Sequence, residues 1–198
     1  MVLQEPDQEI EFVYFIEDGL VSLLSVNSDG GTIEIGMVGS EGMVGIPVIL
    51  GGFSPYRAVV QIEGQAWRLR RRQLAEEFQK NRSLHDILLR YTNTVLVQVA
   101  QSSICNCFHT LQERLSRWLL IADDSTDSDR LPITHDVVAR LLGTRRASIT
   151  VTAGLLQKAG LIKMSRGEIR ISNRAGLESV ACECYGIVRE GVRRMEAS

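Results

Sequence analysis

The chain has 198 residues, a formal net charge of −2, and 44 % hydrophobic and 23 % charged residues, a composition that excludes disordered, collagen-like and disulfide-scaffold proteins. Four cysteines are too few to cross-link a secreted domain, so we expect a reducing, cytoplasmic location. The longest uncharged stretch, residues 91–112, is interrupted by polar side chains, and the sequence therefore predicts no membrane span.

Charge is divided unevenly along the chain. Residues 1–105 carry a net charge of −5, and residues 106–198 carry +3. Within the second part, residues 131–174 carry +6. Such asymmetry is typical of a polyanion-binding segment joined to a segment of another kind. A solvated basic face without a partner would have the same charge, so charge alone does not decide.

The first third of the chain predicts short strands separated by glycine turns. The strands expected from their Val, Ile, Phe and Tyr content are Glu9–Ile16, Leu20–Val26, Thr32–Val38 and Arg57–Ile62. Ten of the 17 glycines lie between Gly19 and Gly64. Short strands at this spacing indicate a β-sandwich or barrel.

Helical patterns follow from residue 70. Arg71–Lys80 predicts a short amphipathic helix, and Asn81 can cap a long one. One stripe of this long helix repeats at intervals of three and four, and we assign it to a dimer interface: Leu84, Leu88, Tyr91, Val95, Gln98 and Ser102. A second stripe, on a neighbouring face, contains Leu89, Leu96, Val99 and Ser103. Two stripes favour a helix that packs on its own β-domain and on a partner helix; burial within a single chain is the alternative. Residues 107–122 predict a further amphipathic helix.

Residues 131–172 predict a winged helix-turn-helix. Thr134 can cap a helix from His135 to Leu142, and Gly143 ends it. A second helix runs from about Arg145 to Lys158, with its expected core contacts at Ile149, Val151, Leu155 and Leu156. Two short strands, 161–164 and 168–172, form the wing.

Such a helix fits the major groove of DNA and presents its first residues to the base edges. Arg145 and Arg146 stand there, and an arginine can donate two hydrogen bonds to a guanine. The residues expected at DNA are Thr134, Thr144, Arg145, Arg146, Ser148, Thr150 and Arg166, with Lys163 and Arg170 of the wing placed over phosphates.

Residues 133–162 resemble, without a gap, the C-terminal winged domain of the cyclic-AMP receptor protein and Fnr (Crp/Fnr) superfamily, and the likeness extends upstream over nearly the whole chain. The resemblance implies an α+β fold with a β-roll sensor of the cyclic-nucleotide-binding, jelly-roll type over residues 1–80. It also implies a dimerisation helix over 81–106 and a winged DNA-binding domain over 107–198. The implied function is homodimeric, sequence-specific transcription regulation. The implied partners are palindromic double-stranded DNA and RNA polymerase. The tail Ala181-Cys-Glu-Cys-Tyr185 resembles a subgroup of these regulators whose effectors are little defined.

The chain departs from the family pattern at both of its sites. Where the family has Arg-Glu-x-x-x-Arg in its reading helix, this chain has Arg146, Ala147 and Val151, so the family's best-known operator is not expected. In the nucleotide cassette the candidate ligand-binding residues are Gly42, Gly45, Arg57 and Ala58. Met43 cannot bind a ribose hydroxyl, and Ala58 lacks the family's phosphate-binding hydroxyl. Both changes disfavour a cyclic nucleotide as cofactor. The family's leading segment is expected to be short or missing here.

Cysteines and histidines do not predict a metal site. No cysteine precedes Cys105, whereas the cluster-binding relatives use an N-terminal cysteine group. On a helix, the two thiols of Cys105-x-Cys107 would point about 200° apart, and the same holds for Cys182-x-Cys184. We therefore interpret all four as packing thiols. His85, His109 and His135 show no spacing of metal ligands.

Two other function classes were weighed. A ligand-binding sensor that signals through a protein partner would use the basic domain only as a scaffold. An enzyme is not expected, because the sequence contains no nucleophile elbow, phosphate-binding loop or acid/base pair of familiar spacing.

Overall fold

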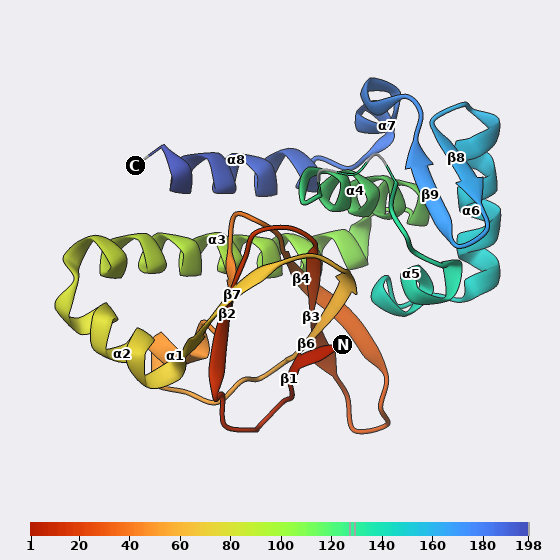
Figure 1. Cartoon of the computed structure of the whole chain (residues 1–198). Coiled ribbons are helices and arrows are strands. Elements are labelled where there is room, and N and C mark those ends of the chain that lie inside the picture. The colour runs from red at the N-terminus through yellow and green to blue at the C-terminus, as the bar shows by residue number, and fades with distance from the viewer. Residues whose placement is uncertain (127, 129, 198) are drawn as a thin grey trace.

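The computed structural model describes residues 1–126, 128 and 130–197. Two antiparallel sheets, of strand order β1-β6-β3-β4 and β5-β2-β7, form the N-terminal β-roll (Figure 1). Their strands are β1 (Val2–Gln4), β2 (Phe12–Ile16), β3 (Leu20–Val26), β4 (Thr32–Val38), β5 (Met43–Val44), β6 (Arg57–Ile62) and β7 (Ala66–Arg70). Buried Val44 from the smaller sheet shares one apolar core with Leu23 and Val38 from the larger. The predicted strands 20–26, 32–38 and 57–62 are confirmed, and the strand expected from Glu9 begins at Phe12.

Three helices follow the sheets or connect them: α1 (Pro47–Leu50), α2 (Arg71–Lys80) and α3 (Arg82–Phe108). The long helix α3 begins where predicted, because the Asn81 side chain accepts a hydrogen bond from the Leu84 backbone N–H at 3.1 Å. One face of α3 packs on the β-roll of its own chain. There the Tyr91 hydroxyl donates to the Met43 carbonyl at 3.0 Å, and the Gln98 side chain accepts from the Met37 N–H at 2.9 Å.

The winged domain comprises α4 (Leu111–Asp124), α5 (His135–Leu141), α6 (Arg146–Lys158), β8 (Ile162–Ser165) and β9 (Glu168–Ile171). The helix predicted from residue 107 begins instead at Leu111, because Thr110 and Glu113 form a capping box. The Glu113 carboxylate accepts from the Thr110 N–H at 2.7 Å, and the Thr110 hydroxyl accepts from the Glu113 N–H at 3.4 Å. The chain therefore changes direction at residues 109–110, between the end of α3 and the start of α4.

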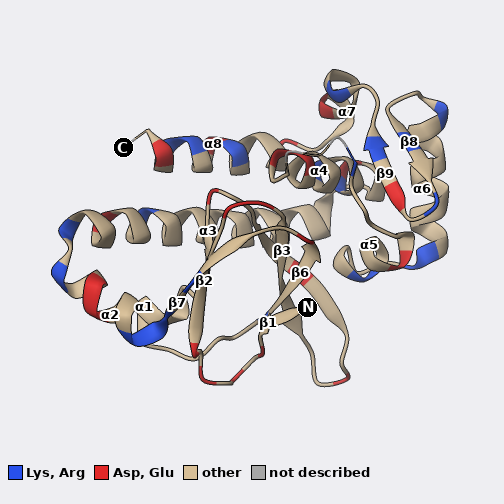
Figure 2. Ribbon diagram, viewed as in Figure 1, with Lys and Arg blue, Asp and Glu red and all other residues tan. Residues whose placement is uncertain are grey.

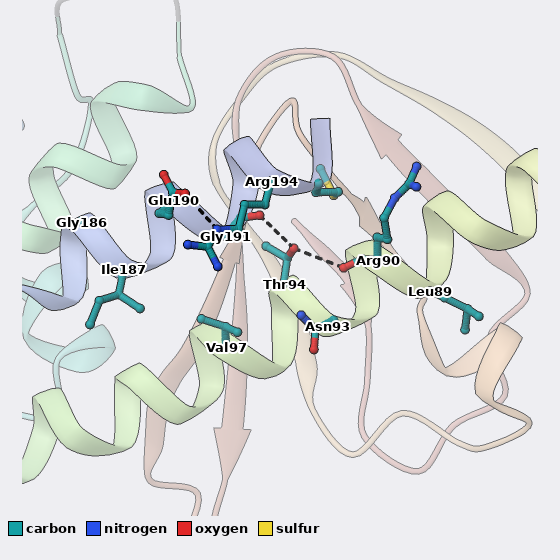
Figure 3. A pocket seen from close by; sticks show the side chains of 11 residues that line it. Leu89, Arg90, Asn93, Thr94, Val97, Gly186, Ile187, Glu190, Gly191 and Arg194 are labelled. Atoms are coloured by element: carbon teal, nitrogen blue, oxygen red, sulfur yellow. Dashed lines mark hydrogen bonds and ion pairs between the residues drawn. The ribbon is translucent and has the colours of Figure 1, made fainter. Parts of the chain in front are cut away.

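A C-terminal helix returns the chain to the first domain. After α7 (Arg174–Val180), α8 (Cys184–Glu196) runs alongside α3 (Figure 1). The Thr94 hydroxyl of α3 lies 3.5 Å from the Gly191 carbonyl oxygen of α8 and 3.2 Å from that of Arg90 (Figure 3). A groove of about 810 Å³ lies between the two helices. The helices α7 and α8 are additional to the elements expected from the sequence.

The two domains share a core. Leu20 and Met37 of the β-roll belong to the same buried cluster as Leu115 and Trp118 of α4. Trp118 also donates a hydrogen bond from its indole N–H to the buried carboxylate of Glu34 in β4, at 2.9 Å. In the part of the chain that the structure describes, we find no helix of the length and apolarity needed to cross a membrane.

Candidate DNA-binding interface

The second helix of the helix-turn-helix, α6, presents its N-terminus to solvent. Gly143 makes the turn before it with φ +60°, a left-handed conformation that glycine adopts without strain. Arg145 is the extended N-cap residue of α6, and Arg146 is its first helical residue. Both side chains are exposed, and Figure 2 shows basic segments at both ends of α6. The first turn therefore combines two cations with backbone N–H groups that lack helical partners.

One face of α6 holds the helix in the domain and the opposite face is exposed. Ile149, Ala153 and Leu156 are buried in the shared core. Val151 is 66 % exposed and Leu155 is 51 % exposed, so their prediction as core contacts is wrong. The reason is the helix period: a residue two positions from Ile149 or Ala153 points away from the core. Val151 lies one turn after Ala147, which is also exposed, and together they form an apolar strip beside the arginines.

The polar residues of α5 and α6 differ in the contacts that their side chains make within the chain. Arg146 Nε lies 3.5 Å from Asp136 Oδ2, in an exposed ion pair that contributes little to stability and that a phosphate or a base can replace. The Thr150 hydroxyl donates to the Arg146 carbonyl at 3.1 Å and also lies 3.1 Å from His135 Nδ1. Thr150 therefore joins α5 to α6. Ser148 is half-buried.

The helix start and the wing complete the basic surface. Thr134 caps α5, where its hydroxyl accepts from the Val137 N–H at 3.4 Å, and Thr144 lies in the turn before α6. Arg166 is exposed in the turn between β8 and β9. Lys163 and Arg170 face each other across the two strands. The seven predicted DNA-contact residues thus lie on or beside α5, α6 and the wing.

The four residues of the predicted nucleotide cassette make contacts within the chain. Ala58 is fully buried in the β-roll, and a Cβ at Gly42 would lie 2.3 Å from the Tyr91 hydroxyl, so both positions are filled. Arg57 Nε is 2.7 Å from the Glu5 carboxylate, which satisfies its charge. Gly45 has φ +118° and packs against Val13.

A cavity of about 360 Å³ lies nearby, between the α1–β6 segment and α3, and sequence analysis did not find it. Its lining is almost entirely apolar, with Ile46, Phe53, Tyr56, Val95, Leu96 and Val99 among the residues. These residues are distant in sequence and follow no ligand motif, so no sequence signal marked them as one site.

The stripe of α3 assigned to dimerisation is covered by its own chain. Leu88, Tyr91, Gln98 and Ser102 are buried, and Leu84 and Val95 pack on the β-roll core. A different row of α3 is exposed, and we call it the α3 stripe: Leu89, Asn93, Leu96, Ala100, Ile104 and Cys107. Its spacing of three and four residues is that of a helix-packing seam. The α3 stripe therefore replaces the six predicted residues as the surface available to a partner.

The cysteine interpretation also changes. Cys105, Cys182 and Cys184 form a buried cluster with His109 beside it, and only Cys107 among the four cysteines is exposed. Cys105 and Cys107 point apart, as predicted for a helix, whereas Cys182 and Cys184 meet in one cluster because Cys182 precedes the helix that begins at Cys184.

Known proteins share both parts of this architecture. Residues 1–81 match a family model described as the cyclic nucleotide-binding domain, and residues 113–180 match the Crp-like helix-turn-helix domain. No curated protein sequence matches the chain. FixK2 from Bradyrhizobium japonicum has the same fold, with a TM-score of 0.78 at 18 % identity over 92 % of this chain and 93 % of its own. The transcriptional regulator TTHB099 of the CRP family from Thermus thermophilus has a TM-score of 0.75 at 20 % identity over 91 % and 93 %.

A β-roll of the cyclic-nucleotide-binding type followed by a winged helix-turn-helix defines a DNA-binding transcription regulator. The chain belongs to the Crp/Fnr family of such regulators. The predicted fold class and the predicted function as a DNA-binding transcription regulator are thereby confirmed.

Proposed function

We propose that this regulator binds a palindromic DNA site as a homodimer, with α6 of each subunit in the major groove and with RNA polymerase as the protein partner of the bound dimer. The observation that carries the DNA geometry is the exposed face of α6. Two arginines stand at its N-terminus, and the apolar strip of Ala147 and Val151 continues from them along the helix. Arg166 of the wing is placed to contact an adjacent phosphate.

The same face indicates what the operator contains. An arginine side chain donates two hydrogen bonds to the O6 and N7 atoms of guanine, whereas apolar side chains contact the methyl group of thymine. We therefore expect each half-site to hold a guanine opposite Arg145 or Arg146 and thymine opposite Val151. Selection of bound duplexes from a random library, with the purified protein in a salt series, tests this. Two such half-sites about 34–36 Å apart are expected. Failure to enrich any duplex with folded, dimeric protein would contradict the proposal.

Dimerisation is proposed to use the α3 stripe. Leu96 is 62 % exposed, Leu89 is 44 % exposed and Ile104 is 42 % exposed, an exposed apolar row that water solvates poorly. The groove between α3 and α8 is continuous with this row, because Leu89 and Asn93 line it together with Ile187 of α8 (Figure 3). A second copy of α3 would cover the row and meet the edge of the groove.

Leu96→Glu is expected to convert the dimer to a monomer, because the dimer would have to bury the new charge beside its symmetry mate. Light scattering after gel filtration measures the mass directly. Ile87→Glu is the matched control: Ile87 lies on the same helix and is 43 % exposed, but it does not belong to the α3 stripe. A dimer that survives Leu96→Glu unchanged, or that Ile87→Glu disrupts equally, would contradict this interface.

We further propose that the sensor does not respond to a cyclic nucleotide. Arg57 is already paired with Glu5, and the cavity beside α3 is apolar, which suits a small apolar molecule and not an anion. Cyclic AMP is therefore expected to leave the affinity for the selected operator unchanged, as measured by fluorescence anisotropy. Titration calorimetry of the protein with cyclic AMP, in the absence of DNA, is the control for nucleotide binding that does not change the operator affinity. A clear gain in operator affinity with cyclic AMP would overturn this part of the proposal.

A further inference from the structure

Four metal-ligating side chains from two distant parts of the chain meet beside the break between α3 and α4. Cys105 lies in the last turn of α3, and His109 is the residue that ends this helix. Cys182 lies between α7 and α8, and Cys184 is the first residue of α8. The three sulfur atoms and one ring nitrogen all lie within 4.8 Å of one another. Cys105, Cys182 and Cys184 are at most 4 % exposed.

The distances correspond to the coordination sphere of a single ion. Tetrahedral zinc with Zn–S bonds of about 2.3 Å and Zn–N bonds of about 2.0–2.1 Å places two sulfurs about 3.8 Å apart and a sulfur and a nitrogen about 3.6 Å apart. Here Cys105 Sγ lies 3.6 Å from Cys182 Sγ, and Cys184 Sγ lies 3.6 Å from His109 Nδ1. In a cubane iron–sulfur cluster each cysteine binds a different iron atom, so the sulfurs would be spread more widely.

A neighbouring residue orients the histidine as metal ligands are usually oriented. His109 Nε2 lies 3.2 Å from the Glu183 carboxylate, so the N–H of the ring belongs at Nε2. Nδ1, the nitrogen that faces Cys184, then carries the lone pair. A carboxylate on the far nitrogen is the usual second partner of a zinc-bound histidine, where it fixes the tautomer and the ring orientation.

Two alternatives to a metal site, packed neutral thiols and a disulfide, account for fewer of the observed contacts. A disulfide requires two sulfurs at about 2.05 Å, and it would leave Cys184 and His109 without a role. The buried side chain of Arg117 is 6 % exposed, and its Nε has no hydrogen-bond partner among the described residues. Arg117 lies close enough to interact electrostatically with Cys105, Cys182 and Cys184. A buried cation beside three cysteines balances the negative charge of three thiolates on one divalent ion.

We propose that Cys105, His109, Cys182 and Cys184 bind one zinc ion in a closed, tetrahedral Cys₃His site. All four positions are protein ligands, so the site has the character of a structural zinc centre. Its ligands come from the end of α3 and the start of α8. The ion therefore fastens the two ends of the DNA-binding domain to each other at the point where that domain joins the dimerisation helix.

The test is the metal content of the full-length protein, prepared with zinc in the medium and a thiol reductant throughout. Mass spectrometry of the metal is expected to find one zinc per chain in the wild type and in Cys107→Ser. Cys107 is the matched control for zinc content, because it lies two residues from Cys105 and outside the cluster of four ligands. Cys184→Ser is expected to lose the zinc, and His109→Ala to hold it more weakly against a chelator.

A second measurement needs only the wild type and stays decisive if Cys184→Ser does not fold. Cobalt(II) added to the zinc-free protein is expected to give the intense visible bands and the thiolate charge-transfer band of tetrahedral, sulfur-ligated cobalt. Labelling of thiols is expected to leave Cys105, Cys182 and Cys184 unmodified when the metal is bound, and to modify all four cysteines after chelation and unfolding. Wild-type protein that contains no zinc and gives no such cobalt spectrum would overturn the proposal, as would a Cys105–Cys182 disulfide that persists under the reductant.

Discussion

Replacing Arg146 with alanine is expected to lower affinity for the selected operator by about 1–3 kcal/mol per half-site and to relax the preference for guanine at one position. Arg146 is exposed at the first turn of α6, and its ion pair with Asp136 is long and solvated, so little free energy is needed to release it. Arg145→Ala is expected to behave in the same way if Arg145 contacts a base. Anisotropy titrations of the operator and of a random duplex, each over a salt series, measure both quantities.

The comparison with Arg166→Ala distinguishes base contacts from phosphate contacts. Arg166 lies in the wing turn, so its loss is expected to weaken operator and random DNA alike and to reduce the salt slope by about one unit per subunit. Arg72→Ala, on α2 in the first domain, is a surface control that should change neither. If Arg146→Ala weakens both duplexes equally, Arg146 is a phosphate contact; if Arg145→Ala does the same, the proposed readout by α6 is wrong.

Glu34 is expected to make the free energy of unfolding decrease as the pH rises toward neutrality. Its carboxylate is 6 % exposed, between Ser22 of β3 and Trp118 of α4, both of which donate hydrogen bonds to it. Burial raises the pKa of Glu34 from its usual value of 4.5 to about 7, although the hydrogen bond from Ser22 and the charge of Arg117 oppose the shift. The folded chain therefore binds this proton more tightly than the unfolded chain does.

The sign of the effect follows from that difference in proton binding. The stabilisation by the protonated carboxyl is fully present below pH 4.5, and it is lost as the pH rises through about 7. The total loss from this group is about 3 kcal/mol. Glu34→Gln imitates the protonated acid: its amide oxygen can accept from Trp118 and its N–H can donate to Ser22. The variant is expected to be more stable than the wild type at pH 8 and to lose the advantage at pH 5.

Urea unfolding between pH 5 and pH 8, at one protein concentration, measures this difference. The concentration is held fixed because the stability of the proposed dimer would depend on it. Glu63→Gln is the matched control, since Glu63 is exposed on the same domain and should follow the wild type. Parallel pH profiles for the wild type and Glu34→Gln would show that Glu34 does not titrate in this range and would contradict the prediction.

Elements whose signals are local were predictable from the sequence. The helix-turn-helix can be recognised from about 30 residues of sequence. Thr134 caps its first helix, Gly143 makes the turn, and two arginines stand at the start of its second helix. Strands 20–26 and 32–38 also show their period and their turns within a few residues. The basic DNA-facing surface followed from these elements, because helix geometry places the first turn of α6 once its boundaries are known.

Features that depend on distant contacts were not predictable. The buried stripe and the exposed stripe of α3 have similar periods, and only the position of the β-roll shows which one remains for a partner. Val151 was placed in the core because an apolar residue on a helix is usually buried, yet on a DNA-reading helix the solvent face can be apolar as well. The meeting of Cys105 with Cys182 requires that α8 return along α3, and no residue near either cysteine encodes that return.

The return of α8 changes the mechanics of the DNA-binding domain. The chain enters this domain after α3 and leaves it before α8, and those two points are adjacent, as the 3.6 Å between Cys105 and Cys182 shows. The domain is thus tied to the rest of the chain at this narrow neck as well as through the core it shares with the β-roll, and it cannot swing on a single strand of chain. From the neck, α8 extends as a rod about 20 Å long. Its far end, at Met195, is embedded in the apolar cluster of the β-roll that contains Tyr91. A displacement of the β-roll would therefore reach the DNA-binding domain along two routes, through the shared core and through α8.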